Sequence, residues 1–318
     1  MKRSQARPVA EQVHRGERGR VVLMEKERLR LQAIEPVRKE ETPPEIRSVL
    51  EDIQDTMGIP WAPVNWRSYA RYPRVLQLFW ERLKPAVATE GFLKEALNIA
   101  ELAYRDVSAW YLPSSRIILA SQDRQPLQWE LDALEYGNPQ LLIQQAALTR
   151  IVRGLYAGRE GPPRARSRPS PYRHPELVMV SEEEAPEPIR QLYQDIKRTI
   201  DLPLVTSDYQ TLAKWPGFLV PAWDDVKRWR ARDEYRRLEY RIAERAEMAA
   251  GRLTPPVGVD PAELRAAAGS QEEHEGLLAL VQLFTHLLPG LIVNIALFRI
   301  AATAGESLPP PTPGSGGS

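Results

Sequence analysis

Cysteine is absent from the 318-residue sequence, which excludes disulfide bonds, thiol nucleophiles, iron–sulfur clusters and cysteine-based zinc sites. Histidine is scarce as well. The four histidines (His14, His174, His274 and His286) lie far apart in the sequence, and none has a partner at the spacing of metal ligands. The sequence therefore predicts no metal site. His286 lies in an apolar run and is expected to be a hydrogen-bonded histidine of the core.

An excess of charge of one sign is also lacking. Lysine and arginine number 43, and aspartate and glutamate number 42, so the net charge gives no reason to expect binding to nucleic acid or to an anionic membrane. A P-loop, a G-x-S-x-G elbow and a G-x-G-x-x-G fingerprint are missing, which argues against nucleotide cofactors and serine hydrolases. We therefore expect a protein that needs no cofactor.

Uninterrupted hydrophobic runs are lacking too. The basic N-terminal residues are not followed by an apolar run, so they do not form a secretory signal. The most apolar stretch, Leu277 to Phe298, is broken by several polar residues and by Pro289-Gly290, which are unfavourable in hydrocarbon. We interpret this stretch as core helices, and we expect a cytoplasmic protein that does not enter the membrane.

What the sequence does contain is an internal repeat. Residues 37–84 align without a gap with residues 180–227, which gives 15 identities at 48 positions, where unrelated segments would share about three. The shared residues include several prolines and Trp80/Trp223. At one position the two copies differ in their chemistry, because the first has Asn65 and the second has Asp208. A carboxylate in only one copy of a duplicated framework indicates a functional residue.

Helical periodicity dominates both copies, and no segment has the regular alternation of strands, so the fold class is predicted to be all-α. Helix breaks are predicted where glycine and proline cluster, and helix starts where a polar residue precedes proline. The predicted breaks are Gly58-Ile59-Pro60, Gly137-Asn138-Pro139 and Thr254-Pro255-Pro256, the predicted starts are Thr42-Pro43-Pro44 and Asp260-Pro261, and a single long charged helix is predicted over residues 224–253.

These patterns divide the chain into five parts. Residues 1–36 are predicted to be a flexible tail, 37–156 the first helical repeat, 157–179 a solvated linker rich in proline and arginine, 180–303 the second helical repeat, and 304–318 a disordered tail. We expect the two repeats to be pseudo-symmetric and to pack around a central site.

The segment Ser207-Asp208-Tyr209-Gln210 has two interpretations. In the first, Ser207 caps a helix, Gln210 completes a capping box, and Asp208 is only a favourable acid in the first turn. In the second, the start of the helix binds an anionic group of a substrate while Asp208 acts as a general base on a water molecule. Spacing alone leaves both open.

Two other residues carry the same ambiguity. Asn138 caps the helix that Pro139 opens, or its amide holds a water molecule in line for attack. Trp61, which follows Pro60, belongs to the core or forms the apolar wall of a pocket.

The motifs DIQDTMGIPW, EYGNPQ and SDYQTLAKWP, in this order and spacing, resemble those of the group I (DL-type) 2-haloacid dehalogenases, a family also called halocarboxylic acid dehydrogenases. The resemblance covers about residues 37–300. It implies an all-α fold of two pseudo-repeats, usually a homodimer, with the active site between the halves. It also implies that a water molecule attacks C2 of a 2-haloalkanoate directly, without a covalent ester, with inversion of configuration and with acceptance of both enantiomers.

The same resemblance assigns roles to individual residues. Asp208 would be the base and Asn138 would help to position the water, while Ser207 and Trp61 would line a pocket for a small carboxylate. A family threonine corresponds to Thr89, the glutamate four residues after it is replaced by Leu93, and aromatic pocket residues fall on Val64 and Leu141. Asn65, the counterpart of Asp208, and Tyr209 complete the candidate substrate-binding residues.

An alternative is a non-catalytic helical homologue that uses the same pocket to bind another small carboxylate. The replacement of the family glutamate by Leu93 favours it. The two hypotheses differ in what surrounds Asp208: a binding protein would have it bonded only to its own helix amides and separated from Asn138 by Val64 and Leu141.

Overall fold

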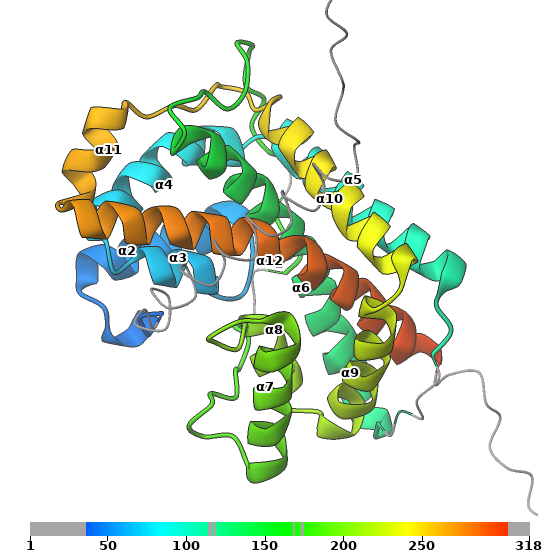
Figure 1. Cartoon of the computed structure of the whole chain (residues 1–318). Coiled ribbons are helices and arrows are strands. Elements are labelled where there is room, and N and C mark those ends of the chain that lie inside the picture. Colours follow the sequence, from blue (N-terminus) through cyan, green and yellow to red (C-terminus); the bar gives the residue numbers. More distant parts are fainter. Residues whose placement is uncertain (1–35, 114–116, 118, 168, 173–174, 305–318) are drawn as a thin grey trace, which may run out of the picture.

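The computed structural model describes residues 36–113, 117, 119–167, 169–172 and 175–304. Within these residues the regular secondary structure consists of helices, and the extended segments form only two isolated bridges, Thr89 with Ala165 and Ala157 with Val257. The predicted all-α fold class is confirmed (Figure 1). The predicted tails, apart from Pro36 and Ala304, lie outside the described residues.

The first part of the chain forms one short 3-10 helix and five α-helices. They are η1 (Lys39–Glu41), α2 (Pro44–Met57), α3 (Val64–Tyr69), α4 (Pro73–Val87), α5 (Glu90–Trp110) and α6 (Ser121–Ile151). The second part forms six α-helices. They are α7 (Glu187–Ile200), α8 (Ser207–Leu212), α9 (Pro216–Arg230), α10 (Asp233–Ala250), α11 (Pro261–Ala268) and α12 (Gln271–Ala304).

The helix boundaries recur at the offset seen in the sequence. Helices α2, α3, α4 and α5 begin at residues 44, 64, 73 and 90, and α7, α8, α9 and α10 begin at residues 187, 207, 216 and 233. The difference is 143 residues in each case (187 − 44, 207 − 64, 216 − 73 and 233 − 90). Matching positions in the sequence therefore occupy matching positions along the helices.

Side-chain contacts recur at the same offset. The indole nitrogen of Trp80 donates to Asp52 (2.7 Å), and the ammonium group of Lys84 donates to the same carboxylate (2.8 Å), so that α4 is tied to α2. These bonds join residues that are identical in the two copies. In the second copy, Trp223 and Lys227 donate to Asp195 at 3.0 and 2.9 Å, and these matching bonds tie α9 to α7.

Helix α2 shows how local sequence sets the boundaries. Pro44 stands in its first turn, where a missing amide hydrogen costs nothing, and Gly58 ends it with φ of 69°. A side chain at Gly58 would be strained in that left-handed conformation, and its Cβ would lie 2.2 Å from the Cβ of Ser170. The predicted start and end of this helix are confirmed.

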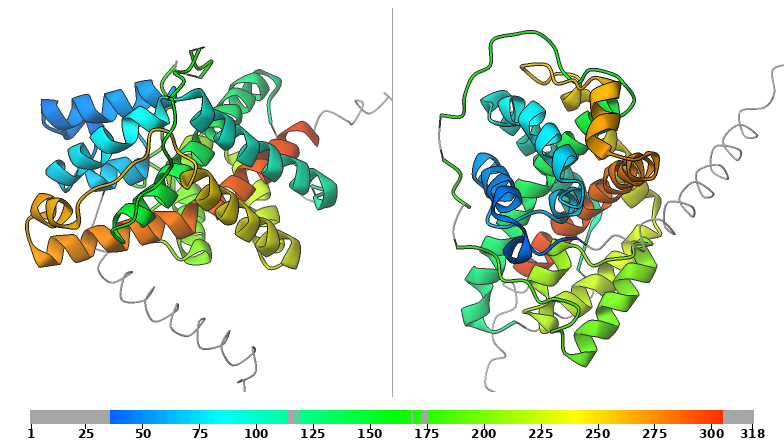
Figure 2. Two further views of the ribbon diagram at one scale, coloured as in Figure 1. Left: turned by 90° about the horizontal axis from the view of Figure 1, so that it is seen from above. Right: turned by 90° about the vertical axis from the view of Figure 1, so that its left-hand side faces the viewer.

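Helices α6 and α12 form the centre of the molecule. Their contact is the most extensive between any two of the described helices, and α12, coloured orange to red, runs across the molecule in the views of Figures 1 and 2. The buried apolar side chains of both parts of the chain belong to one continuous core. Helix α3 belongs to the first part of the chain and α8 to the second. Residues where α3 and α8 approach α6 and α12 therefore lie at the junction of the two parts.

Two predicted breaks within this centre are wrong. Helix α6 continues through Gly137-Asn138-Pro139, and α12 continues through Pro289-Gly290, so Asn138 lies inside a helix and is not a cap. A proline inside a helix costs about 3 kcal/mol. Both helices are nevertheless enclosed by apolar neighbours around their prolines, and that burial favours the continuous helix.

Two further predictions fail for local reasons. The single charged helix predicted over residues 224–253 is divided into α9 and α10, because Arg232 is extended (φ −89°, ψ 150°) and its guanidinium lies over the ring of Trp229. His286 is exposed, with Nδ1 at 2.7 Å from the carbonyl oxygen of Gln282, and is not a core histidine. Its apolar neighbours in sequence face the other side of α12.

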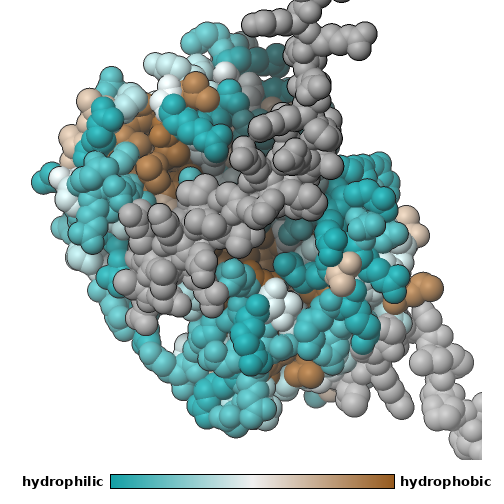
Figure 3. All heavy atoms as spheres, viewed as in Figure 1, coloured by the Kyte–Doolittle hydropathy of each residue, from teal (hydrophilic) through white to brown (hydrophobic). Residues whose placement is uncertain are grey.

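Helix α12 is long and apolar enough to cross a membrane by length and composition alone. In this fold 72% of its most apolar window is buried inside the protein. On the face shown in Figure 3 hydrophilic residues predominate and hydrophobic ones occur in separate small areas. Helix α12 is therefore the core helix of this fold, as its interrupted apolar sequence predicted.

The linker forms no helix in its described residues, but part of it is not solvated as predicted. The guanidinium of Arg166 enters the protein and donates to the carbonyl oxygens of Met57 (3.1 Å) and Val87 (2.9 Å) and to Oε1 of Gln140 (2.9 Å). Met57 and Val87 are the last residues of α2 and α4, and Gln140 lies within α6. Because the carbonyl ends of helices carry partial negative charge, they hold the arginine and anchor the linker beside α6.

Candidate active site

A small chamber lies where α3, α6, α8 and α12 meet. Its free volume is about 10 Å³, which is enough for about one water molecule. Asp208 is the only charged residue among the described residues that line it. The complete lining is Trp61, Pro63, Val64, Asn65, Asn138, Leu141, Ser207, Asp208, Phe284, Leu287, Leu288 and Leu291.

The chamber brings together seven of the nine candidate site residues predicted from the sequence. They come from three separate parts of the chain: the loop before α3 and its first turn, the middle of α6, and the first turn of α8. All seven are buried. They are Trp61, Val64, Asn65, Asn138, Leu141, Ser207 and Asp208.

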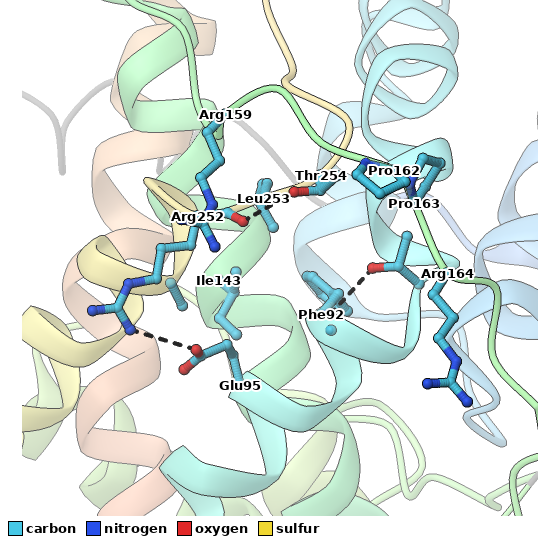
Figure 4. Close-up of a pocket in the computed structure, with 13 residues that line it drawn as sticks. Phe92, Glu95, Ile143, Arg159, Pro162, Pro163, Arg164, Arg252, Leu253 and Thr254 are labelled. Carbon is cyan, nitrogen blue, oxygen red and sulfur yellow. Dashed lines mark hydrogen bonds and ion pairs between the residues drawn. The ribbon is translucent and has the colours of Figure 1, made fainter.

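Thr89 does not lie in this chamber. Its hydroxyl accepts a bond from the amide of Phe92 (3.2 Å) and caps α5. It lines a different cavity, of about 240 Å³, which shares no lining residue with the chamber and is surrounded by exposed arginines such as Arg159 and Arg252 (Figure 4). The predicted place of Thr89 in the substrate pocket is therefore not what the structure shows.

Tyr209 also points away from the chamber. It is completely buried, its hydroxyl accepts a bond from Nδ2 of Asn294 (2.9 Å), and its ring packs against Trp223 and Phe298. Tyr209 is therefore not among the residues that line the chamber. Leu93, which replaces the family glutamate, packs partly buried against the core from α5 and does not line the chamber either.

Sequence reasoning missed one wall of the chamber. Four of its apolar lining residues come from α12, namely Phe284, Leu287, Leu288 and Leu291, and Pro63 completes the set. A signal was available in the sequence, because Asn138-Pro139 in α6 and Leu288-Pro289 in α12 are similar dipeptides at similar places in the two longest helices. The residue that corresponds to Asn138 in this comparison is an apolar leucine.

Asp208 and Asn138 are hydrogen-bonded inside the chamber. Nδ2 of Asn138 donates to Oδ1 of Asp208 at 2.5 Å, and the two side chains are 2% and 4% exposed, respectively. Burial raises the pKa of the Asp208 carboxyl above the usual range for aspartate, while the bonds from Asn138 and from the Asp208 backbone amide oppose that rise. Val64 and Leu141 line the chamber beside the pair and do not separate its members.

The turn of α6 that carries Asn138 is fixed from two sides. On one side, Gly137 leaves room for the indole of Trp61, because a Cβ there would lie 2.3 Å from Cη2 of Trp61. On the other side, the amide of Gln140 donates to the carbonyl oxygens of Tyr136 (3.0 Å) and Met57 (3.3 Å) and accepts from Arg166. The position of Asn138 therefore depends on α2 and the linker as well as on its own helix.

The start of α8 differs from the predicted capping box. Thr206 precedes the helix and Ser207 is its first residue, so Ser207 is not the cap. The hydroxyl of Ser207 is buried and forms no hydrogen bond with the described residues, and the same holds for both polar atoms of the Asn65 side chain. Buried polar groups are rarely without partners in folded proteins, so these groups point to a ligand with polar atoms.

Together these groups suit one kind of chemistry. A buried carboxylate with a raised pKa is a better base than an ordinary aspartate, and the amide of Asn138 fixes its orientation. The chamber has room for one water molecule beside them. Asn65 and Ser207 offer two further donors within an apolar wall. The arrangement can deprotonate a water molecule next to a small substrate from which bulk water is excluded.

Comparisons with known proteins show which proteins this chain is similar to. The profile of the family "Halocarboxylic acid dehydrogenase DehI" matches residues 60–209, from the loop before α3 to the first turn of α8. An (R)-2-haloacid dehalogenase of Pseudomonas putida is 28% identical over 285 residues, which cover 84% of this chain and 92% of that protein. A configuration-inverting 2-haloacid dehalogenase of Pseudomonas sp. (strain 113) is 30% identical over 185 residues, 55% of this chain and 60% of that protein.

Solved structures give the same result. A mutant D-2-haloacid dehalogenase in complex with D-2-CPA has a TM-score of 0.80 and 26% sequence identity, and the match covers 85% of this chain and 96% of that one. A D-2-haloacid dehalogenase in complex with L-LA has a TM-score of 0.79 at the same identity and coverage. The fold, the motifs and the relatives agree: residues 60–209 match the DehI family, and the chain is similar to 2-haloacid dehalogenases over most of its length.

Proposed function

We propose that the protein hydrolyses 2-haloalkanoic acids to 2-hydroxy acids without a cofactor, with Asp208 as the base. Asp208 takes a proton from a water molecule as the water oxygen attacks C2. The carbon–halogen bond breaks as the carbon–oxygen bond forms, and halide leaves from the opposite side, so configuration inverts. One water is consumed, and the products are the 2-hydroxy acid, halide and a proton.

The observation that carries this proposal is the buried pair of Asp208 and Asn138. Asn138 donates to Oδ1 of Asp208, and we assign the proton taken from water to Oδ2. A direct displacement needs its nucleophile held in line with the bond that breaks, and a chamber with room for about one water favours that alignment. The pairing also argues against the binding-protein alternative, in which Asp208 would be separated from Asn138.

We assign Asn65 and Ser207 to the substrate. Halide and carboxylate both carry negative charge that must be stabilised in an apolar chamber. The Nδ2 group of Asn65 and the hydroxyl of Ser207 form no bonds with the described residues, while Asn138 is occupied by Asp208. Trp61, Val64 and Leu141 shape the apolar surface against which the chain of the haloacid packs.

The test is a single turnover in water enriched with oxygen-18. With enzyme in excess over 2-chloropropionate, direct attack puts the heavy oxygen into the lactate in the first turnover. A covalent ester on Asp208 would instead give unlabelled lactate in that turnover and label the carboxylate. Supplying the two enantiomers separately shows whether both react and whether each inverts. Unlabelled first-turnover product would overturn the mechanism, and no halide release from any 2-haloacid would overturn the function.

We also propose that the protein is a cytoplasmic homodimer. Leu97 on α5 is 46% exposed and Tyr240 on α10 is 65% exposed, and these two residues occupy matching positions of the repeat. Exposed apolar side chains on neighbouring helices suit a surface between two copies. Sedimentation equilibrium would test this proposal, with Leu97→Glu expected to give a monomer.

A further inference from the structure

A second cavity adjoins the chamber and is much larger. It has a volume of about 660 Å³ and lies between η1, the loops before α3 and α8, and the segment before α7. Trp61 and Val64 line both cavities and form their common wall. We call the larger cavity the vestibule. Because the chamber as it stands holds about one water molecule, a haloacid must displace part of its wall to enter.

Most cations of the vestibule are already neutralised. Arg38 is paired with Glu183, and Lys197 is paired with Glu182. Lys39 lies 2.9 Å from a carboxylate oxygen of Glu176. In each pair the positive and negative charges compensate one another, so the cation attracts a dissolved anion only weakly.

Arg67 is the exception among the described cations that line the vestibule. Its Nε donates to the carbonyl oxygen of Ala62 (3.2 Å) and its Nη1 to that of Val37 (3.4 Å). No carboxylate of the described residues forms an ion pair with it; burial lowers the pKa of its guanidinium, and the charge of Glu40 partly opposes that change. A partly buried cation without a paired anion is screened less by solvent than a surface cation.

The chamber itself offers no cation to a substrate carboxylate, since Asp208 is its only charged lining residue and is negative when ionised. Arg67 lies on α3 one turn after Val64, which is part of the common wall. Among the described residues, the guanidinium of Arg67 bonds only through Nε and one hydrogen of Nη1, and a guanidinium can bind a carboxylate through two parallel bonds.

We propose that the vestibule is the substrate access route and that Arg67 binds the carboxylate of the incoming acid before it passes Trp61 and Val64. The proposal rests on the proposed function and adds a carboxylate-binding subsite to it. Glu40 and Glu184 line the same cavity. Their negative charges repel further anions, so the vestibule should hold one small anion at Arg67 and not several.

The experiment compares Arg67→Gln, Arg67→Lys and Arg38→Gln with the unaltered protein. Glutamine is the natural residue at the matching position of the repeat, Gln210, which also lines the vestibule. Arg38→Gln is the matched control, because Arg38 lines the same cavity but is ion-paired. kcat and KM are measured with 2-chloropropionate and with its neutral amide, and thermal unfolding is measured for each variant.

Loss of a charge-assisted bond predicts that Arg67→Gln raises the KM for 2-chloropropionate by about tenfold to a hundredfold, with kcat nearly unchanged. The KM for the amide should change by less than threefold, and so should both KM values in Arg38→Gln. Arg67→Lys, which keeps the charge, should recover most of the loss. Equal effects on acid and amide, or equal effects of the Arg67 and Arg38 variants, would overturn the proposal.

Failure of the proposed function can be told apart from failure of the Arg67 subsite: the function fails if the unaltered protein releases no halide. In that case the binding of unreacted 2-chloropropionate, measured by calorimetry, still tests Arg67: weaker binding by Arg67→Gln than by Arg38→Gln supports the subsite, and equal binding refutes it. If Arg67→Gln does not fold, Arg67→Met, which also removes the charge and keeps a long side chain, takes its place in the same comparison of acid and amide.

The wall between the cavities has its own test. Val64→Ala widens the passage, and kcat/KM for 2-bromohexanoate should rise relative to that for 2-chloropropionate. Leu204→Ala, which enlarges only the vestibule, should leave the ratio unchanged. A ratio that responds equally to both variants would contradict passage at Val64.

Discussion

Nδ2 of Asn138 lies 2.5 Å from Oδ1 of Asp208, although the two residues are 70 positions apart in the sequence. The first stands inside a 31-residue helix and the second in the first turn of a six-residue helix. Neither residue can orient itself alone. The bond fixes the orientation of the carboxylate within the chamber.

Replacement of the base should separate activity from stability. Asp208→Asn should reduce kcat by about 10²- to 10⁴-fold for both enantiomers of 2-chloropropionate, because general-base catalysis is lost. The melting temperature should stay the same or rise, since a buried amide costs less than a buried carboxylate. Halide release and thermal unfolding are the measurements. An equally active variant would remove Asp208 from the mechanism.

The pH dependence follows from the direction of the Asp208 shift. Burial raises its pKa, and the base must be ionised to act, so kcat/KM should fall as pH drops through a midpoint above the ordinary range of aspartate. Asn138→Leu removes a donor that lowers this pKa and should move the midpoint to higher pH. The pH dependence of kcat/KM, measured for the unaltered protein and for Asn138→Leu, gives the two midpoints. A midpoint in the ordinary range would contradict the raised pKa.

The same shift has a consequence for stability. Because the pKa of Asp208 is higher in the folded protein than in the unfolded chain, its contribution favours folding below the unfolded pKa and is lost as pH rises through the folded pKa. Asp208→Asn removes this dependence. The free energy of unfolding of the variant, measured with denaturant, should therefore rise relative to that of the unaltered protein as pH increases towards neutrality. A difference in this free energy that does not change with pH would contradict the raised pKa.

Gly137→Ala should lower activity through Trp61. Alanine normally stabilises a helix interior by about 0.5–1 kcal/mol relative to glycine, but here its Cβ would lie 2.3 Å from Cη2 of Trp61. The indole must move, and overpacking costs about 1–3 kcal/mol. Gly91→Ala in α5 is the control, because nothing lies within 4 Å of its Cβ. Halide release and thermal unfolding of both variants give the comparison; equal behaviour would refute the contact.

Asn65→Leu should also move activity and stability in opposite directions. Its amide is buried and makes no bond with the described residues, so leucine, which has the same branching, removes an uncompensated desolvation cost and should keep or raise the melting temperature. Loss of the donor to the developing negative charge should reduce kcat by about a hundredfold. Steady-state kinetics and thermal unfolding decide, and unchanged kcat would show that Asn65 does not serve the substrate.

Arg166→Ala should destabilise the fold by about 2–4 kcal/mol, because it removes charge-assisted bonds and leaves buried carbonyl groups unpaired. The neighbouring Arg164→Ala, which breaks only an exposed pair with Glu90, should cost less than about 1 kcal/mol. Urea unfolding measures both changes. If the two variants lose the same stability, the linker is not anchored through Arg166.

The sequence by itself determined the helical fold class and most of the site. Apolar residues at helical spacing, and proline and glycine at the ends of helices such as α2, act locally, and their effects can be read in a single chain. The difference between Asn65 and Asp208 in an otherwise similar framework indicated Asp208 as the candidate base, and the motifs around Asn138 and Trp61 indicated the residues that surround it. These residues did converge on one chamber.

Only the tertiary structure decided the rest. Proline and glycine favour breaks at Asn138 and Pro289 locally, but burial between α6 and α12 outweighs that preference, and Asn138 becomes an interior residue that reaches Asp208. Thr89 and Tyr209 carry suitable side chains, but the helices direct them elsewhere. Which polar atoms face a common cavity depends on how helices distant in sequence pack together, and the spacing of residues along one chain does not contain that information.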